Sequence, residues 1–461
     1  MNQPYRTVFG AIGALVVATA AGCADTNPEA QGARPHILLV TADALRADHL
    51  SINGYPRNTS PEIDAFASAA WNFSQAVTVI PKTGPSLATL FTGRHPREHG
   101  VRSNANAIPP SLSTLAERLR DSGYRTAAFV SNPVLREEKG YTRGFDTYFL
   151  LDEKSGPAAV SHAFLRWGRE LEGWQQPTFV WLHYIDPHGP YDPPQDLLEP
   201  FLEDEWSQSE QQVRFGRGSH YFNPSKLLGA VPSYQRIEEE SRAAAYVARY
   251  DAEILAVDRA FGLVLRFLRK HDLEDRSAVV FTSDHGESLG EHDYWFEHGW
   301  FAYDPSLRIP LLIREPGQSE ARSVSTPVSN LDLRPTLLAL ARVSDDANAR
   351  GRNLLAAGAR DELIVVESSD RYPDKYLGVR SPTWKYLRRE SDGAEELYDL
   401  ENDPGEERNV AAEEPDRLSA LRERFERAIT DLTPVPDAGL EPFADDPQAL
   451  ERLRDLGYLD E

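Results

Sequence analysis

Short apolar runs alternate with longer helical patterns along this chain. The runs are rich in apolar and β-branched residues, and they lie at 37–41, 124–130, 178–183 and 278–283. Such runs are typical of strands that are buried on both faces of a sheet. The helical patterns between them lie at 85–91, 112–122 and 242–270. Strands that alternate with helices predict an α/β fold with a large, mostly parallel sheet sandwiched by helices.

A second unit is predicted near the C-terminus. Short extended segments separated by turn residues lie at 362–368, 376–380, 384–389 and 396–400. They predict a smaller antiparallel sheet, covered by a helix at 418–432 and followed by a short helix at 450–456. We therefore expect a main domain at 34–355 and a C-terminal subdomain with closing helices at 356–461. Residues 195–240 are rich in Glu, Gln, Ser and Pro and are expected to form an irregular insertion over the sheet.

The N-terminus has the pattern of a secretion signal. Arg6 precedes an apolar, small-residue run at 8–22, which ends in Ala-Ala-Gly directly before Cys23. We interpret 1–22 as a signal peptide with a lipobox and 23–33 as a linker, so that the mature chain is exported and anchored to a bacterial membrane by lipid at Cys23. Contact with the membrane is then expected through this anchor only. The alternative is a plain signal peptide in which Cys23 is incidental.

Composition excludes several classes of protein. Cys23 is the only cysteine, which rules out an intramolecular disulfide framework and a multi-cysteine zinc site. The chain has 72 acidic and 49 basic residues, and its formal net charge is −23. A surface of this charge repels polyphosphates, so we expect no nucleic-acid partner.

Two predicted strands end in acidic residues. Asp43 follows the run 37–41, and Asp284 and His285 follow the run 278–283. In an open α/β sheet the ligand crevice lies at the carboxyl ends of the strands, so these distant segments should meet there. Two carboxylates and an imidazole can hold one divalent cation. The alternatives are that the aspartates are turn residues or helix caps and that His285 is a satisfied interior residue.

Thr83 is the candidate nucleophile. It lies just before the helix predicted at 85–91, where unpaired amides and the positive end of the helix dipole attract an anion. The alternative is that its hydroxyl only caps that helix. Two histidines in loops that follow strands, His188 and His298, can bind anionic oxygen or protonate a leaving group, although structural loop histidines are common.

Ordered motifs along the chain resemble those of the sulfatase family of the alkaline phosphatase superfamily. The motifs are Asp43 to His49, Thr83 to Gly93, Asp186-Pro187-His188, Asp284 to Glu287, Leu307 to Pro310, Asp332 to Thr336, and Trp384-Lys385 followed by Glu396 to Leu400. The resemblance implies an alkaline-phosphatase-like catalytic domain at 34–355. It also implies that Asp43, Asp284 and His285 are metal ligands, that Thr83 is the nucleophile and that His188 faces the substrate.

Four positions depart from the family pattern. Sulfatases carry cysteine or serine at the position of Thr83 and oxidise it to formylglycine, which threonine cannot form. Leu87 and Glu297 stand where the family has arginine and lysine, and Ala42 replaces one of two paired aspartates. These changes remove positive charge and a carboxylate from a site for a tetrahedral anion.

The residues and the resemblance together predict a sulfatase-like, metal-dependent hydrolase of phosphate diesters, phosphonates or sulfate esters that uses a threonine nucleophile. Zinc or manganese is favoured over calcium because His285 is among the ligands. The substrate is expected to be a small-molecule, glycan or lipid-headgroup ester. The alternatives are a phosphoethanolamine-type headgroup transferase, a directly acting sulfuric ester hydrolase, and a noncatalytic binding lipoprotein.

Overall fold

Eight strands form the central sheet, in the order β11-β2-β10-β7-β1-β6-β4-β5. Their bounds are β1 His36–Ala42, β2 Trp71–Phe73, β4 Arg125–Val130, β5 Thr147–Leu150, β6 Thr178–Tyr184, β7 Ser277–Ser283, β10 Leu311–Arg314 and β11 Arg322–Val324. β10 runs antiparallel to both β7 and β2, whereas the other neighbouring strands are parallel. The predicted mostly parallel sheet is confirmed.

The computed structural model of the chain describes residues 33–216, 228–346, 349–356, 363–372, 374–439, 452–453 and 455–457. The predicted signal peptide, its lipobox at Cys23 and the linker up to residue 32 lie outside these residues, as do residues 450, 451 and 454 of the helix predicted at 450–456. Within these ranges, no helix has the length and apolar character needed to cross a membrane.

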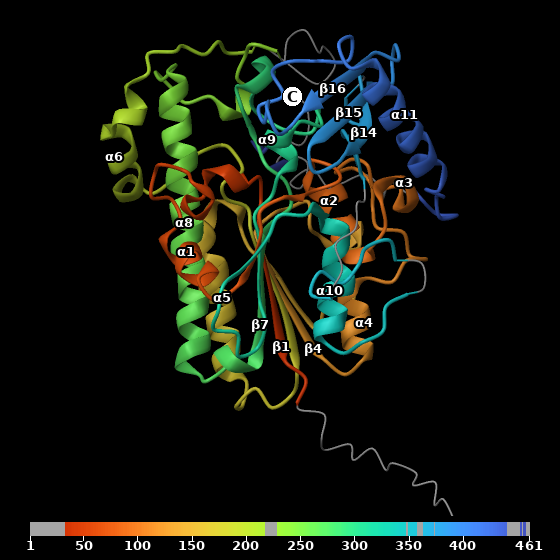
Figure 1. Cartoon of the computed structure of the whole chain (residues 1–461). Helices are drawn as coiled ribbons and strands as arrows, with labels where there is room; N and C mark the ends of the chain where they lie inside the picture. The colour runs from red at the N-terminus through yellow and green to blue at the C-terminus, as the bar shows by residue number, and fades with distance from the viewer. Residues whose placement is uncertain are drawn as a thin grey trace, which may run out of the picture. The chain divides into compact units, whose positions relative to one another are not determined.

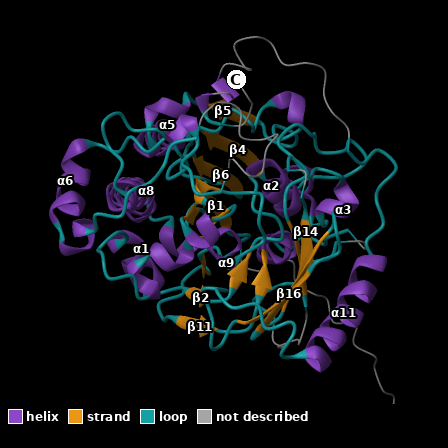
Figure 2. Ribbon diagram, turned by 90° about the horizontal axis from the view of Figure 1, so that it is seen from above, coloured by secondary structure: helices purple, strands orange, loops and turns teal. Residues whose placement is uncertain are grey.

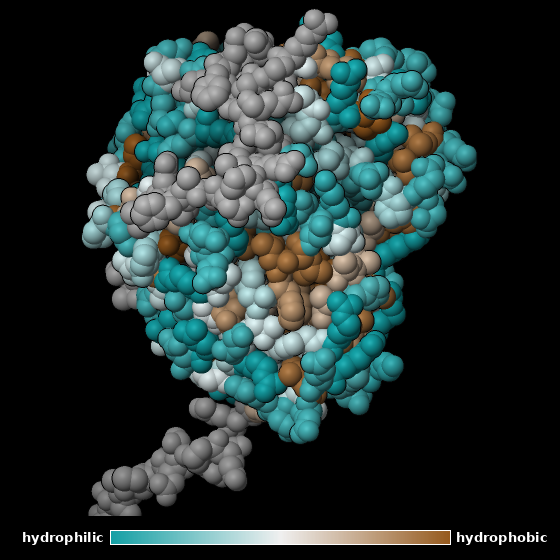
Figure 3. All heavy atoms as spheres, turned by 180° about the vertical axis from the view of Figure 1, so that it is seen from behind, coloured by the Kyte–Doolittle hydropathy of each residue, from teal (hydrophilic) through white to brown (hydrophobic). Residues whose placement is uncertain are grey.

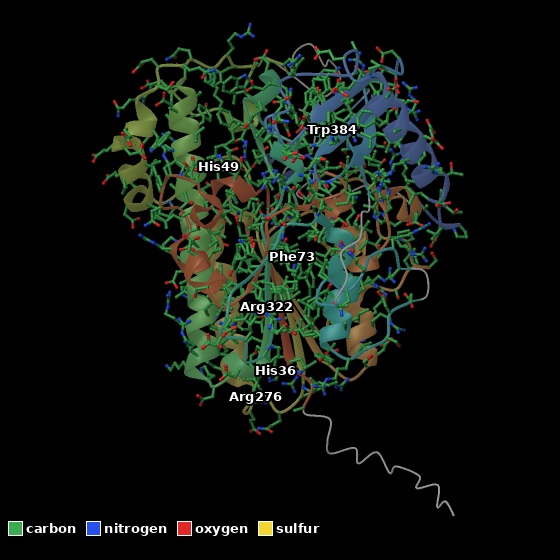
Figure 4. All side chains as sticks on the ribbon, in the orientation of Figure 1. His36, His49, Phe73, Arg276, Arg322 and Trp384 are labelled. Carbon is green, nitrogen blue, oxygen red and sulfur yellow. The ribbon has the colours of Figure 1, made fainter. Side chains whose placement is uncertain are left out.

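The register of the central strands decides where the site lies. Ala42, the last residue of β1, is level with Tyr184 of β6 and with Ser283 of β7. Figure 4 shows His36 and Arg276, which mark the amino ends of β1 and β7, together at one end of the sheet. The carboxyl ends therefore share the opposite edge, at the end where the C-terminal sheet lies in Figure 1.

Helices cover both faces of the sheet (Figure 2). Leu38 and Val40 of β1 pack in a core with α1 (Pro61–Ala67), α5 (Pro157–Glu170) and α8 (Ala243–Lys270). Ile37 and Leu39 pack in a second core with α2 (Thr83–Thr92), α4 (Leu115–Asp121) and α10 (Leu333–Leu340). The apolar run of β1 thus reflects burial on both faces, as predicted.

The segment 195–240 is more regular than expected. It begins with a helix, α6 (Gln195–Glu203), followed by the short 3-10 helices η6 (Glu205–Gln208) and η7 (Ser233–Gln235). Leu197, Leu198 and Phe201 pack against small side chains on one face of α8. The prediction missed α6 because its polar composition hides three apolar residues at helical spacing.

The surface is mainly hydrophilic on the face shown in Figure 3, where apolar side chains gather in a patch near the middle. This is the surface expected for a chain with a formal net charge of −23. Within the described ranges, two of the exposed large apolar side chains, Phe149 and Leu150, belong to the edge strand β5.

The C-terminal sheet has the order β13-β14-β15-β16 and is entirely antiparallel, as predicted. Its strands are β13 Ile364–Glu367, β14 Tyr376–Arg380, β15 Trp384–Arg389 and β16 Glu395–Asp399. The helix α11 (Pro415–Thr430) packs on one face through Leu421 and Phe425. The other face packs on apolar residues of the main body, among them Val79 and Phe301.

The remaining elements are short and lie around the site. They are β3 Ala76–Val77, α3 Pro96–His99, β8 Ser288–Leu289, β9 Trp295–Glu297, α9 Asp304–Leu307 and β12 Val328–Ser329. β3 pairs with β12, and β8 pairs with β9.

A buried ion cluster joins the C-terminal sheet to the main body. Asp304 of α9 accepts from Arg380 Nη2 at 2.9 Å and from Lys385 Nζ at 2.5 Å. Lys385 Nζ also contacts Glu406 Oε1 at 2.7 Å. Burial opposes the ionised form of Asp304, but Arg380 and Lys385 hold its pKa well below the usual value. Each charge in this cluster therefore depends on its partners.

We expect Lys385→Met to lower the free energy of unfolding by about 3–5 kcal/mol, because it leaves Asp304 and Glu406 as buried carboxylates with too few cations. Urea denaturation followed by circular dichroism measures this change.

The matched control is Arg427→Met on α11, where Arg427 pairs with Glu423 on the exposed surface. This change should lower the free energy of unfolding by less than about 0.5 kcal/mol. Equal stability losses for the two variants would contradict the role assigned to Lys385.

Candidate active site

Three strands of the sheet bring acidic and imidazole groups to one point. Asp43 follows β1, His183 lies near the end of β6, and Asp284 follows β7. One ligand atom from each lies within 4.8 Å of the others, and all three residues are buried. His183 Nε2 lies 3.5 Å from Asp43 Oδ2. The convergence of Asp43 and Asp284 predicted from the strand ends is thus present.

Local hydrogen bonds fix the two carboxylates. Asn132 Nδ2 donates to Asp43 Oδ2 at 2.6 Å. The backbone N–H groups of Ala44 and His285 donate to Asp284 Oδ1 at 3.1 and 2.8 Å. Ala44 has φ 58°, which is an unusual conformation for a residue other than glycine. This strained turn directs the Ala44 amide at the carboxylate, as is typical of functional sites.

Buried polar atoms at this point are left without partners. Within the described part of the chain, His183 Nε2 and Asp284 Oδ2 have no hydrogen-bond partner. Burial and the nearby Asp43 raise the pKa of Asp284 well above its usual value. Burial also opposes the ionisation of Asp43, but the adjacent imidazole of His183, whose Nε2 lies 3.5 Å from Oδ2, holds its pKa well below the usual range. Buried nitrogen and oxygen atoms without hydrogen-bond partners are suited to coordinate a divalent cation.

His285 completes the group. Its Nε2 lies 3.5 Å from Asp43 Oδ1 and 3.7 Å from Asp284 Oδ2. Its Nδ1 donates to the Gly286 carbonyl at 2.8 Å, which leaves the Nε2 lone pair facing the carboxylates. Burial lowers the pKa of His285 to about 3, so the imidazole is neutral, as a metal ligand must be.

Thr83 lies against this cluster. It is the first residue of α2, and Lys82 rather than Thr83 takes the N-cap position. Thr83 Oγ1 lies 3.4 Å from Asp43 Oδ2 and 3.4 Å from His285 Nε2. The side chain is therefore directed at the cluster, at the positive end of a helix of 10 residues. Thr83 is therefore not the N-cap residue of α2, and its hydroxyl faces the cluster.

His188 and His298 lie beside the cluster. The ring of His298 is 4.1 Å from that of His285 and 5.1 Å from that of His188, measured between centroids. His188 Nδ1 donates to the Gly189 carbonyl at 2.7 Å. The two predicted histidines are thus brought to the site, and both are buried.

A buried chain of polar groups runs from Lys82 through His298 to Glu287. Lys82 Nζ lies 3.0 Å from His298 Nε2, and His298 Nδ1 lies 3.0 Å from Glu287 Oε1. Because ammonium only donates, His298 Nε2 accepts from Lys82 and Nδ1–H donates to Glu287. Burial lowers the pKa of Lys82 to about 8, although Glu297 acts in the opposite direction.

The departures from the family pattern are all buried. Leu87 belongs to the apolar core between α2 and the sheet, and Ala42 is fully buried at the end of β1. Glu297 Oε1 accepts from the His298 amide at 3.1 Å. Burial and then the charge of Glu297 raise the pKa of buried Glu287 well above its usual value.

Sequence reasoning did not assign His183, Asn132 or Glu287 to the site. His183 follows the same rule as Asp43, since it is a polar residue at the end of a buried apolar run, and that signal could have found it. Asn132 follows β4 in the same way. Glu287 lies in a motif that was noted, but its bond to His298 depends on the path of the loop between β7 and β9.

The chain matches two family models. One is described as Sulfatase and matches residues 35–343; the other is described as N-sulphoglucosamine sulphohydrolase, C-terminal, and matches residues 290–433. An arylsulfatase of Clostridium perfringens is 25% identical over 84% of this chain and 93% of that protein. An ulvan-active sulfatase of Formosa agariphila is 26% identical over 82% of this chain and 77% of that protein.

Solved structures share the fold. A protein in complex with its substrate D-glucosamine-2-N,6-O-disulfate has a TM-score of 0.72 and 21% identity, covering 86% of this chain and 98% of that one. The phosphonate monoester hydrolase of Agrobacterium radiobacter has a TM-score of 0.69 and 23% identity, covering 86% and 95%. Since the Sulfatase model matches more than half of the 461 residues, the chain belongs to the sulfatase family of the alkaline phosphatase superfamily and is a hydrolase of that family.

Proposed function

We propose that this protein is a metal-dependent hydrolase of phosphate diesters, phosphonates or sulfate esters in which the hydroxyl of Thr83 is the nucleophile. The observation that carries the proposal is the position of Thr83 Oγ1, 3.4 Å from both Asp43 and His285 at the first turn of α2. We also propose export and lipid anchoring through Cys23, on the sequence pattern alone.

The proposed metal ligands are Asp43, His183, Asp284 and His285. Two carboxylates and two imidazoles suit zinc or manganese better than calcium, which prefers an all-oxygen site. A bound divalent cation lowers the pKa of a coordinated hydroxyl and neutralises charge on a tetrahedral ester. The orphaned His183 Nε2 and Asp284 Oδ2 support this assignment in the described part of the chain.

The residues around the cluster supply the proton transfers. Thr83 Oγ1–H donates toward Asp43, so that carboxylate accepts the proton as Oγ1 attacks the phosphorus or sulfur atom. The bond from that atom to the leaving oxygen breaks, and the departing alcohol takes the Nε2 proton from the imidazolium form of His188, which is a stronger acid than usual because burial lowers the pKa of His188. A water molecule then attacks the same phosphorus or sulfur atom and gives a proton to the now neutral His188; the bond to Thr83 Oγ1 breaks, and Asp43 returns its proton to Oγ1.

Lys82 offers positive charge for the tetrahedral anion. It is buried beside Thr83, and its Nζ contacts His298. The family pattern places arginine and lysine at the positions of Leu87 and Glu297, so we propose that Lys82 takes over part of their role from another position. A fixed cation in a dry site stabilises charge that develops in the transition state.

The relatives' names leave two ester classes open. Sulfated glycans are suggested by the ulvan-active sulfatase, and phosphonates by the structural neighbour from Agrobacterium radiobacter. We favour phosphorus because a threonine sulfate lacks the elimination route of a formylglycine intermediate.

Thr83→Ala should reduce kcat by at least about 10³-fold because it removes the nucleophile. Thr83→Ser should keep measurable turnover, since the hydroxyl stays in place. The assay compares p-nitrophenyl phenylphosphonate, bis(p-nitrophenyl) phosphate and p-nitrophenyl sulfate side by side. Full activity of Thr83→Ala toward any of them would refute the assignment.

His183→Ala should reduce the bound metal from about one ion per chain to less than a tenth of that, because it removes a ligand from a four-residue site. Inductively coupled plasma mass spectrometry of the purified protein measures this content. His162→Ala, on the exposed side of α5, is the control and should retain the metal. Unchanged metal content in His183→Ala would exclude His183 as a ligand.

Lys82→Met should lower kcat/KM by about 10²-fold or more, because it removes the cation beside the nucleophile. Lys82→Arg keeps a positive charge at this position and should retain part of the wild-type kcat/KM. Steady-state kinetics on the best ester measure both. If Lys82→Met matched the wild type while keeping its metal, Lys82 would have no role in stabilising the anion.

A further inference from the structure

A large cavity opens beside His188. Its volume is about 1150 Å³, and it lies among α5, α6, α8 and the loop that follows β6. In Figure 2 these three helices lie on the same side of the sheet. The lining includes His188 and Glu297, so the cavity reaches the proposed catalytic site. A group attached to the leaving oxygen of a substrate can extend into it.

Much of the cavity wall is apolar. Ile185, Pro157, Leu197, Ala256 and Leu263 are among the lining residues. The ring of Tyr234 also lines the cavity and stacks on the ring of His188 at 6.4 Å between centroids. A wall of this kind binds an aliphatic chain, and the few polar groups in it select what that chain carries.

Two acidic residues supply polar groups without partners. Glu253 of α8 is 3% exposed; its Oε1 accepts from the Asp192 amide at 2.7 Å, but its Oε2 has no hydrogen-bond partner within the described ranges. Asp186 Oδ2 is also buried and lacks a partner among the described residues. Both residues line the cavity. Buried acceptors left unpaired are costly and call for a donor.

The two acids lie close enough to influence each other. Burial and then the charge of Asp186 raise the pKa of Glu253 well above its usual value. Burial raises the pKa of Asp186 to about 7. A cation bound between the two carboxylates would lower the pKa of both Glu253 and Asp186, because it stabilises their ionised forms.

The basic residues in the lining are engaged elsewhere. Lys154, Arg259 and Arg266 form ion pairs at the surface, with Asp455 at 3.5 Å, Asp196 at 3.7 Å and Glu62 at 2.5 Å respectively. All three side chains are about half exposed or more. These three basic residues therefore lie at the solvent-exposed rim of the cavity. Acidic side chains outnumber basic ones in its interior.

We propose that this cavity binds a protonated primary amine on the alcohol portion of the substrate, with N–H donors to Glu253 Oε2 and Asp186 Oδ2. The inference rests on the proposed function for the position of the ester, since His188 lines the cavity and its ring lies 5.1 Å from that of His298 at the proposed site. It narrows the substrate to an ester whose leaving alcohol carries an ammonium group on an aliphatic chain. Charge-assisted hydrogen bonds from an amine are stronger than those between neutral groups.

The test compares two small probes that differ only in charge and donors. 5-Aminopentan-1-ol carries an ammonium group where hexan-1-ol carries a methyl group of similar size. Isothermal titration calorimetry on the full chain should show binding of the amine about tenfold tighter than binding of hexan-1-ol. Equal affinity of the two alcohols would overturn the proposal.

Two variants locate the amine. Glu253→Gln and Asp186→Asn should each weaken binding of 5-aminopentan-1-ol about tenfold and leave hexan-1-ol unchanged. Glu170→Gln, at the exposed end of α5, makes the same charge change away from the cavity and should have no effect. If the affinity for the amine survives in a folded Glu253→Gln variant and in Asp186→Asn, the assignment is wrong.

The outcome separates this proposal from the proposed function. Thr83→Ala should bind the amine as tightly as the wild type does, even though it turns over no ester. If the protein binds the amine through Glu253 but turns over no ester, the proposed hydrolase function is refuted and the cation site is supported. If turnover depends on Thr83 but the amine is not preferred, only the cation site is refuted.

Discussion

The structure depends on placing two carboxylates, Asp43 and Asp284, side by side where water is excluded. The parallel register of β1 with β6 and β7 makes this unavoidable, because the three strands end at the same level. Two buried carboxylates whose oxygen atoms lie within 4.8 Å of each other repel when both are ionised. They can both carry charge only if a cation compensates it. The imidazoles of His183 and His285 add nitrogen ligands, and the lowered pKa of His285 keeps that ring uncharged. A divalent cation resolves the conflict, and the hydroxyl of Thr83 lies where such an ion would polarise it.

The site differs from the family pattern in where its charge comes from. Lysine is missing directly before His298, and arginine is missing four residues after Thr83. Lys82 instead brings an ammonium group to His298 from the start of α2, while Glu297 occupies the vacated position. The ammonium group beside His298 thus comes from the residue before Thr83, and an acid, Glu297, lines the cavity that we propose to bind an amine.

Much of this arrangement could be predicted from the sequence. The buried strands were identifiable because residues such as those of β1 are apolar on both faces, and Asp43 and Asp284 were identifiable because parallel strands end together. The start of α2 was predicted two residues late, since Thr83 and Gly84 do not favour a helix by themselves. His183, Asn132 and Glu287 escaped notice because their roles depend on which strands and loops are neighbours. The helix α6 was missed because tertiary packing on α8, rather than composition, stabilises it.

We propose that one divalent cation is held by Asp43, His183, Asp284 and His285 next to Thr83. A crystal structure of the purified protein, with anomalous difference maps collected at the zinc and manganese absorption edges, would locate such an ion. We expect a single anomalous peak about 2.0–2.2 Å from atoms of these four side chains, with Thr83 Oγ1 directed at it. A map without a peak there, or a peak with Thr83 turned away from it, would rule this metal site out.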